Sequence, residues 1–374
     1  MKQSRLMSLA LLVIAVLVAA LGCSPAKDVA GSDDTMSVAD WKPEYKDGVL
    51  QPLPDGFPNQ DIMIINPDDA GSRDGLYARH WAQAMEKFSP VNLTVTDRPD
   101  FGSLFGTWSA LDDMERDKLG KEGYMVVVAQ IVGAAQDLLS TDVTATLGSQ
   151  LDDYNFVIGT EQVPHVLAQR KNPPWGSTKF MDMVDYVKAH PGEVTYVCRG
   201  PGDGLDLTWK AYSEALGGLK FREVCGEDRQ QMTSIVGAGE GDITYNTPGE
   251  VLVGVQANKM DVIFVGGAAP VAKDVPWAGV PNGATILGPE DPWKFPAGFA
   301  VAKDVPELHR QWLYELFQNG IKDPELIKAR STVPGILLFD KPLNHDESRA
   351  AAEANLEAIK PMLQDLDMCP GCGQ

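Results

Sequence analysis

Short apolar runs alternate with helical patterns along most of this chain, and that alternation constrains its fold more than any other feature. The first run is Ile-Met-Ile-Ile at residues 62–65, which is typical of a strand buried on both faces. A glycine-containing loop follows, and the heavier apolar residues of 76–88 then recur at helical spacing. Strands that alternate with helices in this way predict βαβ units built on parallel strands.

The alternation runs in two successive blocks. The second block begins with the strand-like residues 194–198, and a return segment with a further strand at 298–302 follows it. We therefore expect an α/β fold of two lobes, each a mainly parallel sheet flanked by helices, with a cleft between them. Strands near residues 160–169 and 265–293 would cross between the lobes. The expected boundaries are residues 46–162 together with 283–374 for the first lobe and residues 163–282 for the second.

The amino terminus has the pattern of an export signal that ends at a cysteine. Lys2 and Arg5 flank the start of an apolar run at residues 6–20. This run is shorter than the roughly 20 residues that span a bilayer, so a cleaved signal peptide at 1–22 fits better than a transmembrane helix. The Ala-Leu-Gly before Cys23 resembles a bacterial lipobox, which implies a lipidated Cys23. The alternative is an ordinary secretory signal with a coincidental cysteine.

Residues that follow Cys23 are consistent with a flexible tether, which we expect over residues 23–45. Residues 24–38 hold almost no large apolar side chains, so this part cannot contribute to a core. The globular part would then lie in the periplasm or another extracytoplasmic space, anchored to the membrane through Cys23.

Composition and cysteine positions restrict the partners. The chain has 32 Lys and Arg against 52 Asp and Glu, which argues against nucleic acid as a partner because binding it depends on neutralising phosphates.

Two pairs of cysteines follow Cys23 in the chain. Cys369 and Cys372 lie near its end in the segment Cys-Pro-Gly-Cys, which is either a local disulfide or a tail without a catalytic role. Cys198 and Cys225 end two successive strands, and a disulfide and two buried free thiols are equally open there.

Motifs of the common enzyme classes do not occur in the sequence. It has no nucleophile elbow, no phosphate loop with Gly-Lys-Ser/Thr and no His-Glu-x-x-His helix. Its five histidines are scattered without metal-ligand spacing. We therefore expect a protein that is not an enzyme and holds no metal or cofactor.

Two loops at strand ends are candidates for a binding site. Residues 67–74 follow the first strand, residues 198–206 follow the first strand of the second block, and both loops contain glycine and open a helix. Ligands in open α/β sheets bind outside the carboxyl ends of the strands, and the amides of a helix start favour a carboxylate or phosphate. Either loop alone could also be a tight turn without function.

Several segments, taken in order, resemble the substrate-binding receptors of tripartite tricarboxylate transporters, which are also called Bug-type periplasmic receptors. The resemblance covers residues 57–367, and it implies a Venus-flytrap fold of the type II periplasmic binding proteins. It also implies a monomer that captures a small carboxylate between its lobes and delivers it to membrane permease subunits, with no chemistry. The segments are residues 57–62, 67–79, 95–102, 123–124, 186–192, 200–202 and 239–243.

The resemblance also implies which residues bind the ligand, because the loops of such receptors hold its carboxylate largely through backbone amides and bridging water. The first loop would contribute Asp69, Ala70, Gly71, Ser72, Arg73 and Asp74. The second would contribute Arg199, Gly200, Pro201, Gly202, Asp203 and Asp206, and a third contribution would come from Tyr245, Asn246 and Thr247.

This chain departs from the family pattern towards acidic residues. Asp203 and Asp206 stand where the family commonly has serine and histidine, and Gly71-Ser72 replaces a double glycine. The aspartates would repel a tricarboxylate unless Arg73 and Arg199 face inward. We infer a ligand with one carboxylate and a cationic or polar remainder, such as an amino acid or amide. Alternatively, these aspartates cap helices or face water. For the chain as a whole, the alternatives to a transport receptor are a ligand-sensing lipoprotein that signals to a membrane receptor and a hydrolase.

Overall fold

Two large β-sheets organise Val38–Gln374 in this computed structural model. The structure describes residues 37–101, 106–140, 143–200, 203–226, 228–293, 295–333, 335–365, 367 and 369. The signal peptide, the lipidated Cys23 and most of the tether lie outside these residues. At the end of the predicted tether, Trp41 packs against the hydrophobic core and Asn319 donates a hydrogen bond to the Tyr45 hydroxyl at 2.6 Å.

A six-stranded sheet forms the first lobe, in the strand order β13-β6-β12-β5-β3-β4. Its parallel strands are β3 (Ile62–Asn66), β4 (Leu93–Asp97) and β5 (Met125–Gln130), and its antiparallel strands are β6 (Asn155–Gln162), β12 (Pro296–Val301) and β13 (Leu337–Leu343). A separate hairpin joins β1 (Tyr45–Lys46) to β2 (Val49–Leu50). The helices that accompany this sheet in the chain are α1 (Arg73–Glu86), η1 (Pro99–Phe101), α2 (Gly106–Arg116), α3 (Lys118–Glu122), α4 (Ile131–Ser140), α5 (Val143–Leu147), η2 (Leu151–Asp153), α11 (Glu307–Gly320), α12 (Pro324–Ser331) and α13 (His345–Asp365).

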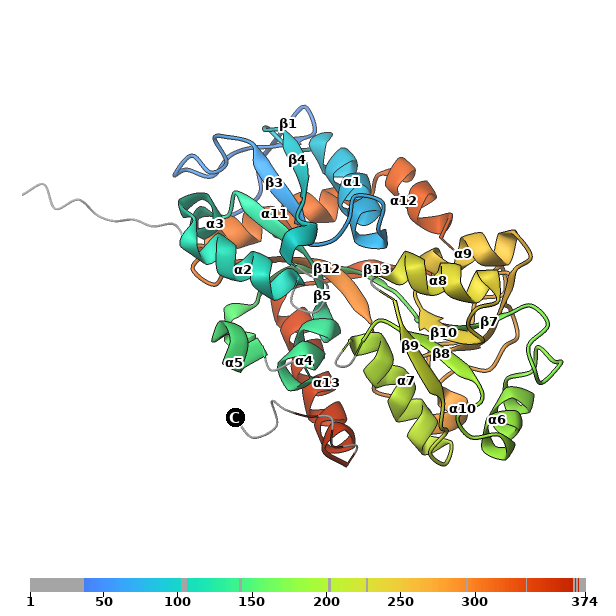
Figure 1. The fold of residues 1–374 in the computed structure, drawn as a ribbon. Helices are drawn as coiled ribbons and strands as arrows, with labels where there is room; N and C mark the ends of the chain where they lie inside the picture. Colours follow the sequence, from blue (N-terminus) through green and yellow to red (C-terminus); the bar gives the residue numbers. More distant parts are fainter. Residues whose placement is uncertain are drawn as a thin grey trace, which may run out of the picture. The chain divides into compact units, whose positions relative to one another are not determined.

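A five-stranded sheet forms the second lobe, in the order β11-β7-β10-β8-β9. The parallel strands are β8 (Thr195–Cys198), β9 (Arg222–Cys225) and β10 (Ile243–Asn246), and β7 (Val166–Arg170) pairs antiparallel with both β10 and β11 (Met260–Val265). Figure 1 shows the two sheets as separate layers of strands with helices packed around each. The helices here are α6 (Phe180–Ala189), α7 (Gly204–Ala215), α8 (Arg229–Ala238), α9 (Pro248–Gln256) and α10 (Ala284–Leu287).

The predicted two-lobed α/β fold is confirmed, but the sheets are mixed rather than mainly parallel. In each sheet three neighbouring strands pair parallel to one another, and the remaining pairings are antiparallel. The reason is the crossing between lobes: β6 leads through residues 163–165 into β7 of the other sheet, and β12 returns the chain to the first sheet beside β6. The strands of the two sheets come from the ranges expected for the two lobes, whose boundaries stay a prediction.

Separate hydrophobic cores support the two lobes. One core lies around the six-stranded sheet and includes Trp81 and Trp312, while another lies against the five-stranded sheet and includes Trp209 and Trp293. Helix α13 contributes to both cores, through Ala352 to the first and through Ile359 and Leu363 to the second. None of the helices in the described part of the chain has the length and apolarity that a bilayer crossing requires.

Cys198 and Cys225 are partners in the register of the parallel strands β8 and β9. Their Cα atoms lie 4.3 Å apart and their sulfurs are bonded, so the structure has a disulfide where the sequence left two readings open. Cys369 is also disulfide-bonded. Cys372 lies outside the described residues, and the predicted Cys369–Cys372 link stays a prediction.

Candidate ligand-binding site

Both predicted loops line one cavity of about 100 Å³ between the two sheets. The first-lobe wall comes from the end of β3, the amino termini of α1 and α2, and helix α4. The second-lobe wall comes from the β8–α7 loop and the first residue of α8. The lining residues are Pro67, Asp68, Asp74, Gly106, Thr107, Gln130, Gly133, Gln136, Asp137, Tyr154, His165, Arg199, Asp203, Gly204, Leu205, Arg229 and Phe295.

The first loop is shaped by the buried side chain of Asn66, the last residue of β3. Its Nδ2 atom donates to the carbonyl oxygens of Asp68 and Asp69, at 2.7 and 3.0 Å. Helix α1 then begins after Ser72, whose Oγ accepts from the Gly75 amide at 3.0 Å. A Cβ atom at Gly75 would lie 2.6 Å from the Ala70 carbonyl oxygen, so the close approach of these two backbone segments requires glycine here.

The second loop is held by two aspartates. Asp203 caps helix α7 by accepting from the Leu205 amide at 2.9 Å. Asp206 is 1 % exposed and accepts from the Tyr196 hydroxyl at 2.6 Å and from the Gly200 amide at 2.9 Å. Burial, followed by the nearby Asp203 charge, raises the pKa of Asp206 to about 7.

Two arginines face the cavity from the second lobe. The Arg199 side chain is 5 % exposed, its Nη1 atom lies 3.5 Å from Asp203 Oδ2, and its Nε has no hydrogen-bond partner among the described residues. Burial lowers the pKa of Arg199, and the neighbouring Arg229 adds to this effect. Arg229 Nε likewise lacks a partner in the described part of the chain. Burial by itself would lower the pKa of Arg229. The negative charges of Asp203 and other carboxylates together have the larger effect, so the pKa of Arg229 is raised.

Acidic and neutral polar groups complete the cavity on the side of the first lobe. Burial raises the pKa of Asp68 moderately and that of Asp137 well above the usual range, and the Asp203 charge adds to the second shift. His165 lies between β6 and β7, stacks on Phe295 with ring centroids 3.7 Å apart, and is 8 % exposed. Burial holds the pKa of His165 well below its usual range, so the ring is neutral at physiological pH.

Comparisons with known proteins agree with this architecture. No protein-family model matches the chain. A UPF0065 protein of Bordetella pertussis is 22% identical over 193 residues, which are 52% of this chain and 56% of that protein, so the match spans little more than half of the relative. The periplasmic binding protein BugD superposes with a TM-score of 0.68 at 16% identity, over 84% of this chain and 99% of the other. MatC from Rhodopseudomonas palustris with bound malate gives a TM-score of 0.64 at 16% identity, over 83% and 99%.

This chain has the fold of the Bug-type periplasmic binding proteins. The predicted resemblance is thereby confirmed at the level of the fold.

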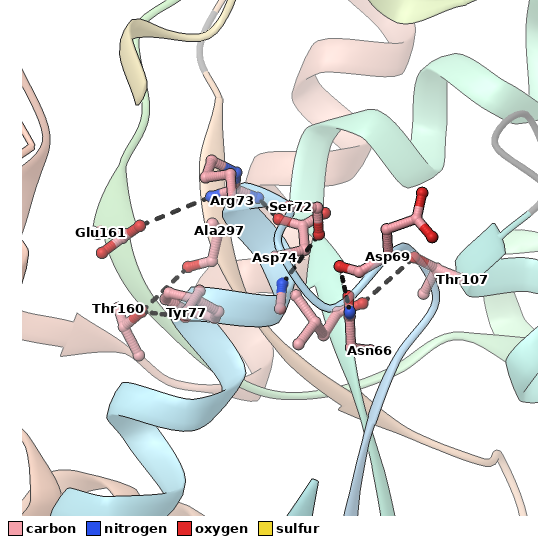
Figure 2. Close-up of polar contacts among 12 residues, drawn as sticks. Asn66, Asp69, Ser72, Arg73, Asp74, Tyr77, Thr107, Thr160, Glu161 and Ala297 are labelled. Atoms are coloured by element: carbon pink, nitrogen blue, oxygen red, sulfur yellow. Dashed lines mark hydrogen bonds and ion pairs between the residues drawn. The ribbon is translucent and has the colours of Figure 1, made fainter. Parts of the chain in front are cut away.

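Arg73 is a predicted ligand residue that the Bug-type fold turns away from the cavity. Its guanidinium is 4 % exposed, pairs with Asp74, and lies 3.7 Å from Glu161 Oε1 on β6 (Figure 2). Glu161 in turn accepts two hydrogen bonds from Arg330 of α12, at 2.7 and 2.9 Å. Arg73 therefore joins the first loop to a buried ion network and is absent from the cavity lining, where Arg229 provides the second guanidinium.

The other predicted residues divide between the cavity and its surroundings. Asp74, Arg199 and Asp203 line the cavity, and Asp69, Gly71 and Ser72 line a neighbouring one that shares Asp68 and Arg229 with it. Ala70 is exposed, and Gly200 and Asp206 support the second loop from outside the lining. Pro201 and Gly202 lie outside the described residues.

The third predicted contribution, from Tyr245, Asn246 and Thr247, lies beneath the site rather than in its lining. Asn246 Nδ2 donates to the Arg229 carbonyl oxygen at 3.0 Å and lies 3.2 Å from Thr233 Oγ1. Asn246 therefore acts through α8, by positioning the turn that carries Arg229.

Sequence reasoning missed Arg229 and Asp137. Arg229 follows the end of strand β9, so reading every strand end in the second block would have found it. Asp137 lies inside α4, a helix that the apolar pattern did not reveal, and no sequence signal pointed to it.

Proposed function

We propose that this chain is an extracytoplasmic solute-binding receptor that captures a small carboxylate-bearing molecule between its two lobes. The observation that carries this proposal is the cavity itself, because loops from opposite sheets line it together with Arg199 and Arg229. Guanidinium groups are well suited to binding carboxylates. The fold shared with MatC, whose structure holds malate, supports the same ligand class.

We further propose that the receptor is anchored through lipidated Cys23 and delivers its ligand to permease subunits of a tripartite tricarboxylate-type transporter. The lipobox-like residues before Cys23 and the resemblance of residues 57–367 to receptors of such transporters support this assignment. Binding without chemistry fits the sequence, which has no motif of the common enzyme classes.

Thermal unfolding in the presence of single small carboxylates tests the receptor function. A ligand at 100 times its dissociation constant stabilises the folded state by about 2.7 kcal/mol, which gives a rise of several degrees in Tm. Proton NMR of the same mixture should show the carboxylate unchanged after hours. Turnover would indicate a hydrolase, and a panel of mono-, di- and tricarboxylates and amino acids that leaves Tm unmoved would refute the proposal.

Transport is tested separately from sensing. Deletion of the gene should abolish uptake of the identified radiolabelled ligand, and re-expression of the full chain should restore it. Uptake that persists while transcription ceases to respond to the ligand would indicate a sensor instead.

A further inference from the structure

Backbone amides of both loops already bind acceptors from the chain itself. Such amides would otherwise be the donors that hold a ligand carboxylate at a helix start. The Arg73 amide also faces the carboxylate of Glu250 at the start of α9. The occupied pairs are the Asp69 amide with Asp68 Oδ1 at 2.8 Å, the Gly200 amide with Asp206 Oδ2 at 2.9 Å, and the Leu205 amide with Asp203 Oδ1 at 2.9 Å.

Three side-chain nitrogens around the cavity are open to a ligand. Nε of Arg199, Nε of Arg229 and Nδ1 of His165 have no hydrogen-bond partner among the described residues. Arg199 and His165 are also more than nine-tenths buried, with side-chain exposure of 5 % for Arg199 and residue exposure of 8 % for His165. A buried polar group without a partner costs free energy, and a bound ligand would recover it.

Carboxyl groups and guanidinium groups lie mainly on opposite walls of the cavity. Asp68, Asp74 and Asp137 come from the first lobe, and Arg199 and Arg229 come from the second. Asp203 is the one acid on the second wall among the lining residues, and it is engaged by the Leu205 amide and lies 3.5 Å from Arg199. A ligand that spans the cavity therefore meets carboxylates at one end and guanidiniums at the other.

Total charge and size restrict the ligand further. The described lining holds four carboxyl groups and two guanidiniums, and one of the carboxyl groups, that of Asp74, is already paired with Arg73 outside the lining. A cavity of about 100 Å³ compares with the roughly 10–15 Å³ that is needed to hold one water molecule. The site thus suits a molecule of few non-hydrogen atoms with both signs of charge.

We propose that the cavity takes a small zwitterion, an amino-acid-like molecule whose carboxylate meets Arg199 and Arg229 and whose ammonium group meets Asp68 and Asp137. This assignment rests on the proposed receptor function and narrows it to a ligand class. The side-chain guanidiniums then replace the loop amides as the main anchor of the carboxylate.

Calorimetric titration of the purified chain with matched pairs tests the proposal. The pairs are L-alanine with propionate and L-aspartate with succinate, extended to the other protein amino acids and their counterparts that lack the amino group. We expect at least one amino acid to bind, and to bind at least tenfold more tightly than its counterpart. If the counterparts bind equally well or better, the receptor function stands and the zwitterion assignment fails. If nothing in the panel binds, both fail.

Substitutions test which side chains bind the ammonium end of the ligand and which bind its carboxylate end. Asp137→Asn should weaken binding of the amino acid at least tenfold and leave affinity for its counterpart unchanged or improved, while Arg229→Gln should weaken both. Asp68→Asn provides a second test of the acidic wall. Asp185→Asn, which removes the same charge from an exposed position of α6, is the control and should bind like the parent. Folding is checked by circular dichroism, and an unchanged preference in both Asp137→Asn and Asp68→Asn would overturn the assignment.

Discussion

Replacing Glu161 by glutamine removes one negative charge from the buried network that connects the first loop to the crossing strand β6. Glu161 is fully buried, and its partner Arg330 has a side chain that is 2 % exposed. Both Glu161 oxygens accept from the Arg330 guanidinium, at 2.7 and 2.9 Å, and Arg73 lies 3.7 Å away. Glutamine keeps the size of the side chain but leaves the arginine charge without compensation.

We expect this substitution to lower the free energy of unfolding by about 3–5 kcal/mol, which is the cost of breaking a buried ion pair on one side. The measurement is urea denaturation followed by both circular dichroism and tryptophan fluorescence, whose transitions should coincide if unfolding is two-state. The double variant Glu161→Leu/Arg330→Met should recover most of the loss, because an apolar pair of similar volume replaces both charges.

An exposed ion pair provides the matched control. Asp112 and Arg116 pair on the surface of α2, where the Arg116 side chain is 72 % exposed. Asp112→Asn should therefore cost at most about 1 kcal/mol. A loss below about 1 kcal/mol for Glu161→Gln, or a double variant as unstable as the single one, would refute the reasoning about the buried network.

Three further predictions concern the second lobe. Replacing Cys198 and Cys225, which are 27 positions apart, by serine should lower the free energy of unfolding by about 3–4 kcal/mol from the loop-closure entropy; a loss below about 1 kcal/mol in urea denaturation would contradict this. Because burial raises the pKa of Asp206 from 3.8 to about 7, its contribution to stability is complete at low pH and is lost as pH rises through about 7. Asp206→Asn should flatten that decline in Tm measured from about pH 4 to about pH 8, and an unchanged profile would count against the shift. Tyr212→Phe removes the hydrogen bond that the hydroxyl donates to Asp291 at 2.6 Å and should cost about 1–3 kcal/mol, measured in the same way, with no change at all as the opposing result.

Most of what the sequence predicted about the site came from the loops that follow the ends of strands. Apolar runs located β3 and β8, and the rule that ligands bind beyond such ends led to the two loops. The family resemblance then implied Asp74, Arg199 and Asp203 within them, and these three residues line the cavity. These residues line the cavity because their positions depend on local order: a strand, a glycine-containing turn and a capped helix.

The sequence pattern does not predict the direction in which a side chain points. Arg73 and Arg199 looked alike in the sequence, yet Arg73 turns to Glu161 while Arg199 faces the cavity. The choice depends on Glu161, a residue far along the chain on the crossing strand β6. A buried guanidinium follows the nearest carboxylate, and only the packed chain defines which carboxylate that is.

The sequence by itself determined the α/β class, the two blocks and the two loops, because strand and helix periodicities are local properties of the chain. Only the tertiary structure decided that the sheets are mixed and that Arg229 and Asp137 belong to the cavity. Strand direction depends on where the chain crosses between lobes, and a shared cavity depends on which distant side chains that crossing brings together.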